Sequence, residues 1–333
     1  MRTDLLDFLA CPTCRKERPF EVTGRQVNDA GDVISGTLDC RECRATFDIR
    51  DGIPRFVKTA EDYCANFGFQ WQEWRTLQID RLSGHTLSED RFLADSRWPK
   101  DWLAGKLILD AGCGAGRFAD VAAGFGATVV AVDLSDAIDA CQKTTAVHQG
   151  RVHCLQASLL ALPLRADLFD AVYCMGVIQH TPDPPAVMRA LPTHLKAGGR
   201  LAYNFYEEGL WRRLQVVKYL LRLFTPKLSV AANLALSRFL VAALFPLTKI
   251  LAGIPKIRIV NHFLPIAAVH DPKLPPDKQR AWTLLDTFDW YGARYEKRQH
   301  HQAVAGLLSE AGMQAVESLP GLAWAVRPSD DQG

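Results

Sequence analysis

The sequence predicts an α/β protein in which a mainly parallel sheet is flanked by helices, with a small metal-binding module in front of it. From Lys106 onward, short apolar runs alternate with amphipathic stretches, a pattern typical of βαβ units. Two Cys-x-x-Cys pairs lie within the first 43 residues, and paired knuckles in an intracellular chain indicate a metal site. A chain of 333 residues with 48% hydrophobic content can bury one large core and still form a small extra module.

Composition narrows the class of protein without defining its function. The net charge of +2 at pH 7 is too small to indicate a nucleic-acid or membrane partner by itself. The N-terminal stretch MRTDLLDFLACP carries acidic residues and lacks the continuous apolar segment of a signal peptide, so we expect a cytoplasmic protein. Its nine cysteines should then be mostly reduced, and their odd number fits metal ligands and free thiols better than a disulfide framework.

The front module is defined by two knuckles, Cys11-Pro-Thr-Cys14 and Cys40-Arg-Glu-Cys43, separated by a polar, turn-rich stretch. Each knuckle presents two thiolates, and two facing knuckles supply the four sulfur ligands of a closed structural zinc site. A module of about fifty residues buries too little apolar surface to fold unaided, so zinc would contribute the missing stability. The alternatives are four unrelated thiols, which the regular spacing disfavours, and a redox motif, which needs only one pair.

Strands and helices alternate through the middle of the chain. The apolar runs predict strands at about 106–111, 128–133, 152–156, 169–175 and 199–205. The amphipathic stretches predict helices at about 117–125, 136–148 and 185–195. Gly198-Gly199 is expected to stop the last of these helices before the fifth strand. After a long insertion, HQAVAGLLSEAG predicts another helix, and MQAVESLP with LAWAVRP predicts a closing strand pair around Gly321.

A glycine-rich segment, LDAGCGAGR at residues 109–117, follows the first strand. Glycines let the backbone turn tightly and approach a ligand at the carboxyl end of a strand, where open α/β sheets bind their ligands. Arg117 stands where a dinucleotide fingerprint needs its third glycine, and the carboxylate of Asp110 would repel a pyrophosphate. A cationic sulfonium with an amino-acid tail suits this loop better. The second strand closes with Asp133, which is placed to accept hydrogen bonds from both ribose hydroxyls.

These motifs resemble those of the class I methyltransferases, particularly the type 11 group, over about residues 105–206. LDAGCGAGRF is similar to motif I, VVAVDLS to motif II, and FDAVYCMGVIQH with LKAGGRL to the fourth-strand motif and the segment before strand five. The resemblance implies a Rossmann-like, seven-stranded methyltransferase sheet. It also implies S-adenosylmethionine (SAM) as the cofactor.

The resemblance further implies which residues would bind the cofactor. Asp110, Gly112 and Gly114 would line the methionine moiety, and Asp133 would hold the ribose with Leu134 beside it. Cys174, Met175 and Gly176 would border the cofactor on the fourth strand. Ser158-Leu159 occupies the position where the family commonly has an Asp that contacts the adenine amine, so the shorter Ser side chain departs from the pattern there.

The front module has a resemblance of its own. LLDFLACPTC together with TFDIRDGIP resembles the Trm112-like zinc-ribbon family over about residues 5–57. Modules of that family usually stabilise or dock onto a methyltransferase domain. The resemblance therefore implies a structural role for the four cysteines and their zinc, not a catalytic one.

An aromatic segment, YCANFGFQW at residues 63–71, continues through Trp74 and Arg75 and joins the two modules. Its aromatic density predicts an ordered cap and not a free tether, and it resembles the linker of ribbon-bearing bacterial methyltransferases. We expect it to pack over the cofactor mouth, where Gln70 or Arg91 would reach the methionine carboxylate. Plain packing between the domains is the alternative.

The candidate catalytic base is His180, just beyond the fourth strand. Methyl transfer depends mainly on alignment, so no obligatory triad is expected, but a His poised near neutral pH would help a hydroxyl or amine acceptor. The alternative is structural: His180 would brace a turn in which Asp183 caps the next helix and Pro184 stands at its first position.

A second cluster, DTFDWYGARYE at residues 286–296, interleaves acids, aromatics and an Arg. It suits an acceptor pocket for a polar ring or phosphate, with Tyr291 as a second catalytic candidate; a helix cap with domain-edge packing is the alternative. His300-His301 follow without spaced metal-ligand partners beyond Glu296, so we do not expect a metal there.

The insertion at residues 207–280 is basic and apolar. Residues 209–270 contain no Asp or Glu but carry Arg212, Arg213, Lys218, Arg222, Lys227, Arg238, Lys249, Lys256 and Arg258. Pro226, Pro246 and Pro255 are expected to cut it into helices too short to span a bilayer. Such helices fit an interfacial lid on anionic lipid or over an anionic, partly apolar acceptor. A cap packed on its own domain or on a dimer partner is the alternative.

The expected organisation is a zinc ribbon (1–57), a linker or cap (58–104), a methyltransferase domain (105–206 and 281–330) and the insertion (207–280). We expect an enzyme that methylates a small or lipid-linked acceptor such as a sugar, quinone or polyketide. It should be cytoplasmic, with peripheral contact to the inner membrane face if the insertion binds lipid. An RNA base methyltransferase is disfavoured because no Asn/Asp-Pro-Pro-Phe/Tyr motif follows the fourth strand and the core lacks a broad basic face. A non-enzymatic docking scaffold is disfavoured by the intact glycine loop and Asp133.

Overall fold

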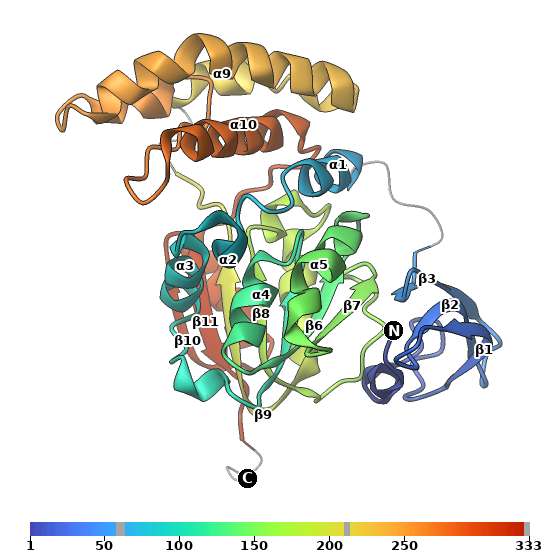
Figure 1. Ribbon diagram of the computed structural model, residues 1–333. Coiled ribbons are helices and arrows are strands. Elements are labelled where there is room, and N and C mark those ends of the chain that lie inside the picture. The colour runs from blue at the N-terminus through green and yellow to red at the C-terminus, as the bar shows by residue number, and fades with distance from the viewer. Residues whose placement is uncertain (58–63, 210–213, 330–333) are drawn as a thin grey trace.

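One twisted sheet runs through the whole molecule. The computed structural model describes residues 1–57, 64–209 and 214–329; Tyr63, Arg212 and Arg213 lie outside the described residues. Eleven strands are hydrogen-bonded in the order β1-β2-β3-β4-β7-β6-β5-β8-β9-β11-β10. Figure 1 shows the first strands as a module at one side, the larger α/β unit in the middle and a layer of helices above it.

The central part of the sheet has seven strands. Five of them are parallel: β5 (Leu107–Ala111), β6 (Thr128–Asp133), β7 (Val152–Gln156), β8 (Phe169–Met175) and β9 (Leu195–Asn204). The closing pair, β10 (Gln314–Leu319) and β11 (Leu322–Val326), is antiparallel, and β11 joins the edge of β9. The seven-stranded α/β sheet expected from the sequence is thus confirmed, as are the strand pair around Gly321 and the positions of the first four parallel strands.

The expected role of Gly198-Gly199 as a helix stop is wrong, because both residues lie inside β9. The register shifts where Phe169 pairs with Leu195 but Ala171 pairs with Arg200, so β9 carries extra residues there. Gly198 has a φ of 73°, a conformation that glycine adopts without strain. The glycine pair therefore forms an irregularity in a strand that begins earlier than expected.

Helices cover both faces of this sheet. On one face, α4 (Arg117–Gly124) and α5 (Ala137–Thr145) bury Phe118 and Ile138 in a cluster with the strands, and Figure 1 shows both helices in front of the sheet. On the other face, α6 (Pro184–Ala190) and α11 (His301–Glu310) bury Met188 and Leu308 in a second cluster. Asp183 caps α6 as expected, since its carboxylate accepts a hydrogen bond from the Ala186 N–H at 3.0 Å.

The front module contains the 3-10 helix η1 (Thr3–Phe8) and four antiparallel strands, β1 (Phe20–Val27), β2 (Val33–Cys40), β3 (Thr46–Arg50) and β4 (Ile53–Arg55). Its last strand pairs in parallel with β7 of the α/β unit through Arg55 and Gln156. Leu5 and Leu9 are fully buried in the same apolar cluster as the sheet residue Leu155. The module is therefore continuous with the α/β core.

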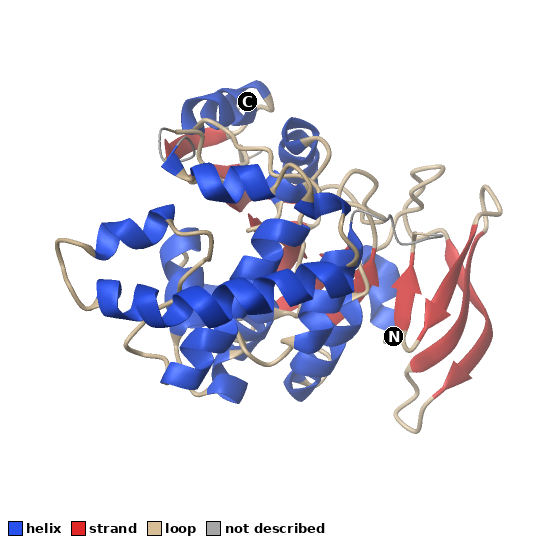
Figure 2. Ribbon diagram, turned by 90° about the horizontal axis from the view of Figure 1, so that it is seen from above, coloured by secondary structure: helices blue, strands red, loops and turns tan. Residues whose placement is uncertain are grey.

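A helical cap lies above the carboxyl ends of the parallel strands (Figures 1 and 2). It includes α1 (Ala65–Glu73), α8 (Val216–Leu221), α9 (Val230–Ala252), the 3-10 helix η8 (Arg258–Phe263) and α10 (Pro276–Gly292). The helices α2 (Asp80–Ser83) and α3 (Leu87–Ser96) lie lower, beside α4 (Figure 1), and α3 packs against α4 and β9. The helix α10 packs against both α1 and α9. It is therefore part of the cap, and it continues past residue 280, where the insertion was expected to end and the methyltransferase domain to resume.

The expectation that Pro246 ends a helix is wrong. The helix α9 runs without interruption for 23 residues and contains Pro246. A proline removes one intrahelical hydrogen bond but need not end a helix, and α9 as a whole is rich in Leu and Ala, which favour helix. By length and composition α9 is long and apolar enough to cross a bilayer, and most of its side chains are not buried. Pro226 and Pro255 do lie outside its two ends.

Candidate functional site

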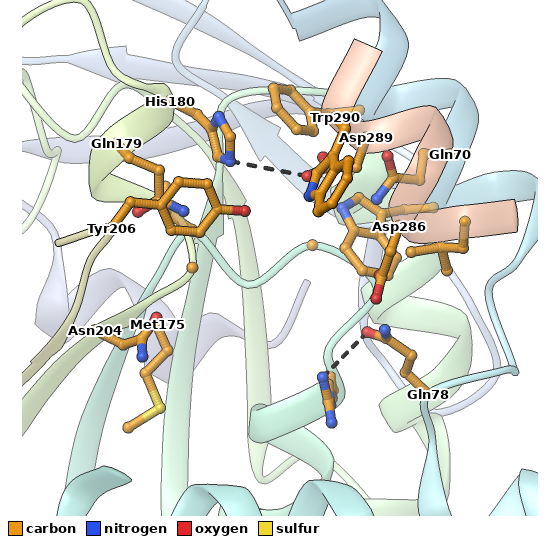
Figure 3. A pocket seen from close by; sticks show the side chains of 18 of the residues that line it. Gln70, Gln78, Met175, Gln179, His180, Asn204, Tyr206, Asp286, Asp289 and Trp290 are labelled. Carbon is orange, nitrogen blue, oxygen red and sulfur yellow. Dashed lines mark hydrogen bonds and ion pairs between the residues drawn. The ribbon is translucent and has the colours of Figure 1, made fainter. Parts of the chain in front are cut away.

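A cavity of about 510 Å³ lies between the carboxyl ends of β5, β6 and β8 and the helical cap. Its walls are formed by the glycine loop, the ends of β6 and β8, the helices α1 and α10, and the segment 261–269 that follows α9. Figure 3 shows side chains from β8, β9 and the turn after β8 on one side and side chains from α1 and α10 on the other. The cavity thus lies where open α/β sheets bind their ligands.

The glycine loop connects β5 to α4 and forms the floor of the cavity. Gly112 and Gly114 line it, and both have positive φ, 91° and 52°. A Cβ atom on Gly112 would lie 2.5 Å from a methyl carbon of Val177, so no larger residue fits without a shift. A Cβ on Gly114 would lie 3.0 Å from the Trp71 indole, which packs on the loop from α1.

Asp133 ends β6 and holds the glycine loop in place. Its carboxylate accepts hydrogen bonds from the Gly114 N–H at 2.9 Å and from the N–H and hydroxyl of Ser135 at 2.9 and 2.7 Å. Burial raises the pKa of this carboxyl above its ordinary value. Asp133 therefore lines the cavity and at the same time organises the loop.

The other expected cofactor residues divide into two groups. Leu134, Ser158, Leu159 and Met175 line the cavity together with Asp133 and the loop glycines. Asp110 and Cys174 are not among the lining residues; both are buried within strands of the sheet, β5 and β8. Burial raises the pKa of Asp110 to about 7. The structure therefore places Asp110 in the interior of the sheet instead of on the cavity wall.

The helices α1 and α3 contribute the polar residues expected near the cavity mouth. Gln70 and Arg91 both line the cavity. Gln70 is 2% exposed, and its carbonyl oxygen has no hydrogen-bond partner. The Arg91 guanidinium binds the carboxylate of Asp95 at 3.1 Å and the side-chain oxygen of Asn204 at 3.3 Å. A second cation, Arg117, also lines this part of the cavity, and burial lowers its pKa to about 9.

His180 lies at the opposite end of the cavity. Its Nδ1 is 2.9 Å from the carbonyl oxygen of Tyr295, and its Nε2 is 3.9 Å from a carboxylate oxygen of Asp289. The imidazole contacts the rings of Phe67 and Tyr206, with centroid distances of 5.2 and 5.6 Å. The structure thus brings His180 together with the cluster at residues 286–296, which is more than a hundred residues away in sequence.

Only part of that second cluster reaches the cavity. Asp286, Asp289 and Trp290 line it. Tyr291 does not: it is fully buried, and its hydroxyl donates to the carbonyl oxygen of Pro265 at 2.8 Å. Arg294, expected to help recognise a phosphate, is exposed and lines a separate cavity with Arg222.

Glu296, also from this cluster, forms a buried ion-pair group of its own. Its carboxylate lies 3.1 Å from the Lys218 ammonium, 3.6 Å from the Arg222 guanidinium and 3.0 Å from the Arg298 guanidinium. His300 and His301 instead meet Glu207, which is the carboxylate partner that sequence spacing did not indicate. Its oxygens already accept hydrogen bonds from the N–H groups of His301 and Gly321.

Several cavity residues were not singled out from the sequence. Tyr206 and the segment 261–269 line the cavity but belong to no motif, whereas Gln179 lies in the fourth-strand motif next to His180. Gln179 follows β8 and Tyr206 follows β9, so the position after a strand end was the available signal for these two residues.

The front module brings its four cysteines into one cluster. The ligand atoms of Cys11, Cys14, Cys40 and Cys43 all lie within 4.8 Å of one another. The sulfurs of Cys11 and Cys43, and those of Cys14 and Cys40, are 3.7 Å apart. A tetrahedral zinc site with bonds of about 2.3 Å has sulfurs roughly 3.8 Å apart, so the cluster can hold a metal ion.

Comparison with known proteins agrees with this architecture. Residues 109–203 match the family described as Methyltransferase domain, and residues 2–52 match the family described as Trm112p-like protein. The α/β unit thus contains a segment that is similar to methyltransferase domains. The chain joins this segment to a module that is similar to Trm112, as the sequence motifs predicted.

Individual relatives are similar over part of the chain. A ubiquinone biosynthesis O-methyltransferase from Idiomarina loihiensis is 36% identical over 107 residues, which cover 31% of this chain and 44% of that protein. One from Xanthomonas oryzae pv. oryzae is 38% identical over 109 residues, covering 30% and 42%. The chain thus spans less than half the length of these curated relatives. Among solved structures, magnesium protoporphyrin IX methyltransferase from Synechocystis is 18% identical with a TM-score of 0.44, covering 80% of this chain and 97% of that one.

Proposed function

We propose that this protein transfers a methyl group from SAM to a hydroxyl group of a small or lipid-linked acceptor. The observation that supports this most is the arrangement of the glycine loop and Asp133 on one wall of a cavity, within the segment that matches the methyltransferase family. The names of the relatives, O-methyltransferases of ubiquinone biosynthesis, favour an oxygen atom of a quinone-type ring as the acceptor.

The residues present fit SAM. The acidic Asp133 stands at the end of β6, where ribose hydroxyls would donate to it, with Leu134, Ser158 and Leu159 around the adenine. At the other side of the loop, the unpartnered carbonyl oxygen of Gln70 would accept from the methionine ammonium. The cations Arg91 and Arg117 line the same region and would attract the methionine carboxylate.

His180 would serve as the general base. SAM supplies a methyl group on a positively charged sulfur, which makes the leaving group a neutral thioether. Because the Tyr295 carbonyl can only accept a hydrogen bond, Nδ1 of His180 carries the proton that it donates there. In the tautomer with its single proton on Nδ1, Nε2 would carry a lone pair. That nitrogen would take the proton from the acceptor hydroxyl, and the cap would position the acceptor.

The Trm112-like module would hold one structural zinc ion. The four thiolates have the number, type and spacing that a closed tetrahedral site requires. The metal would stabilise a module whose last strand extends the central sheet at β7. Its contribution would therefore be to the folded state of the whole chain.

The cap would also contact an anionic lipid surface. The inward side of α9 buries Asn233, Ser237 and Thr248 beside Val241 and Phe245. Its outward side exposes Phe239 and Ile250, and the exposed apolar surface continues over residues 254–260. Exposed cations border this surface: Arg238, Lys249, Lys256 and Arg258. An apolar face with basic residues and no acid suits a membrane interface, and Asn261–Val269 leads from it to the cavity wall.

The direct test separates cofactor binding from chemistry. Calorimetric titration with S-adenosylhomocysteine (SAH) should show one site per chain, and labelled SAM should transfer its methyl to a demethylated quinol with a short side chain. The His180→Gln variant should bind SAH normally but transfer the label much more slowly, by the factor of about 10²–10⁴ typical of a lost general base. A wild-type protein that binds no SAH would refute the proposed function.

A further inference from the structure

The end of the cavity beneath α10 carries two buried acidic side chains. Asp286 and Asp289 stand one helical turn apart on α10 and both line the cavity. Within the described ranges, no Lys or Arg forms an ion pair with either carboxylate, and Asp289 has only the imidazole of His180 at 3.9 Å. Burial raises the pKa of both carboxyls, that of Asp286 to about 7. Figure 3 shows Asp289 directed toward His180 and Asp286 toward the side of Gln78.

Gln179 precedes His180, and the hydrogen-bonding groups of its side-chain amide have no partner among the described residues. Its side chain is fully buried and lines the cavity. A buried amide without partners costs free energy, so the group is expected to bind something that enters the cavity. Figure 3 shows Gln179 on the same side of the cavity as His180.

We propose that Gln179, His180 and Asp289 form the acceptor subsite, and that this subsite selects an uncharged head group carrying the reacting hydroxyl and a second oxygen. The proposal rests on the proposed function, because it assigns the place where the methylated hydroxyl binds. In this subsite His180 takes the proton, Asp289 acts as a positioning residue for the resulting imidazolium, and Gln179 binds the second oxygen.

The His180–Asp289 separation supports the position of the hydroxyl. A gap of 3.9 Å between Nε2 and the carboxylate oxygen is too long for a direct hydrogen bond, but an oxygen atom beside it can lie about 2.8 Å from both. The O–H of the acceptor then breaks toward Nε2, and the positive charge gained by the imidazole faces the Asp289 carboxylate. The indole of Trp290 lines the adjoining wall and offers a surface for a ring.

The charges around Asp289 disfavour an anionic head group. Besides His180, the groups that act on it electrostatically include the cations Lys218 and Arg222 and the anion Glu296. Both cations are already occupied by Glu296, at 3.1 and 3.6 Å. An acceptor carrying a phosphate or carboxylate beside His180 would therefore face the Asp289 carboxylate at low dielectric, with Lys218 and Arg222 already paired to Glu296.

Binding of matched probes to the SAH-loaded protein tests the proposal without requiring turnover. The probes are two neutral hydroxylated rings, 4-methylcatechol and methyl glucoside, and their carboxylate counterparts, 3,4-dihydroxybenzoate and methyl glucuronide. At least one neutral probe should bind wild type, and about tenfold more tightly than its carboxylate counterpart. Gln179→Met should weaken the neutral probe at least about fivefold, the effect of one lost hydrogen bond. Asp289→Asn should reduce the discrimination against the carboxylate probe.

Asp277→Asn provides the matched control, since it removes an exposed carboxylate from the same helix and should leave all affinities unchanged. SAH affinity confirms that each variant is folded.

A kinetic measurement tests the role of Asp289. In Asp289→Asn, the kcat of methyl transfer to the bound neutral probe should fall, while the KM for SAM stays within about twofold. Normal SAH binding with equal affinity for charged and neutral probes, or with no binding of either neutral probe, overturns the subsite but leaves the proposed function standing. Failure to bind SAH refutes the proposed function itself.

Discussion

The carboxylate of Asp133 accepts a hydrogen bond from the backbone N–H of Gly114, with 2.9 Å between the oxygen and the nitrogen. The last residue of β6 is thereby tied to the middle of the loop that follows β5. The same carboxylate accepts two further hydrogen bonds from Ser135, just before α5. A change at Asp133 therefore affects the shape of the loop as well as any ligand bound to it.

Replacing Asp133 with Ala should abolish measurable SAH binding and also lower the free energy of unfolding by about 1–3 kcal/mol, because buried donors lose their acceptor. Calorimetric titration and urea denaturation measure the two effects. Asp101→Ala, at an exposed position, is the control and should change neither. Unchanged SAH affinity in Asp133→Ala would contradict the ribose assignment.

The cysteine cluster should contain one tightly held zinc ion per chain, which elemental analysis of the purified protein would count. Replacing Cys11 and Cys14 with Ser should lower the thermal midpoint strongly, because the module then loses half its ligands. Activity per folded molecule should change much less. A folded wild-type protein that contains no metal would refute the zinc site.

Asp110 should make stability depend on pH. Burial raises its pKa to about 7 in the folded state, compared with about 3.9 in an unfolded chain. Its contribution is therefore complete below about pH 4 and is lost as the pH rises toward 7. In Asp110→Asn the free energy of unfolding should fall less between pH 4 and 7.5 than in wild type. Urea denaturation across that range measures this, with Asp101→Asn as control. If the free energy of unfolding of Asp110→Asn and of wild type depends on pH in the same way, the raised pKa of Asp110 is contradicted.

The buried ion-pair group around Glu296 should be essential for attachment of α8. Burial alone would raise the pKa of Glu296, but Lys218 and Arg222 hold it at about 2. Glu296→Gln leaves these cations buried without a counter-charge and should cost about 3–5 kcal/mol. Glu310→Gln, at an exposed position, should cost little. Thermal denaturation of both variants makes the comparison, and equal midpoints would contradict the role of Glu296.

Vesicle co-sedimentation tests the lipid-facing cap. Anionic vesicles should bring down the protein at low salt and neutral vesicles should not, since nearby Lys and Arg each gain about 1 kcal/mol at an anionic surface and salt screens the attraction. Arg238→Ser with Lys249→Ser and Lys256→Ser should weaken binding. Lys218, which sequence reasoning counted among the surface cations, is 2% exposed and paired with Glu296, so it is not part of the test.

The control replaces an equal number of exposed cations on the front module, Lys16, Arg25 and Arg50. If wild type sediments with neither vesicle type, the lipid contact is wrong. The exposed face of α9 would then be a contact between two copies of the chain, which a sizing measurement detects.

The candidate site could be predicted from sequence only where it is built from contiguous residues. The glycine loop follows β5, and Asp133 and Met175 are the last residues of β6 and β8, so local pattern placed them on one edge of the sheet. Asp110 belongs to the same motif as the loop glycines, yet it is buried and does not line the cavity. Motif membership located the residue but not whether its side chain reaches the cavity.

By itself, the sequence determined the first four parallel strands, the closing strand pair and the two cysteine knuckles, because residue period, glycine freedom and ligand spacing act over short stretches of chain. Only the tertiary structure decided that β4 extends the sheet at β7, that α9 continues through Pro246, and that Asp289 faces His180. These features depend on how α10 and the front module pack against the α/β core. Packing joins residues far apart in the chain through burial and hydrogen-bond satisfaction, and no local pattern records which partner a buried group will meet.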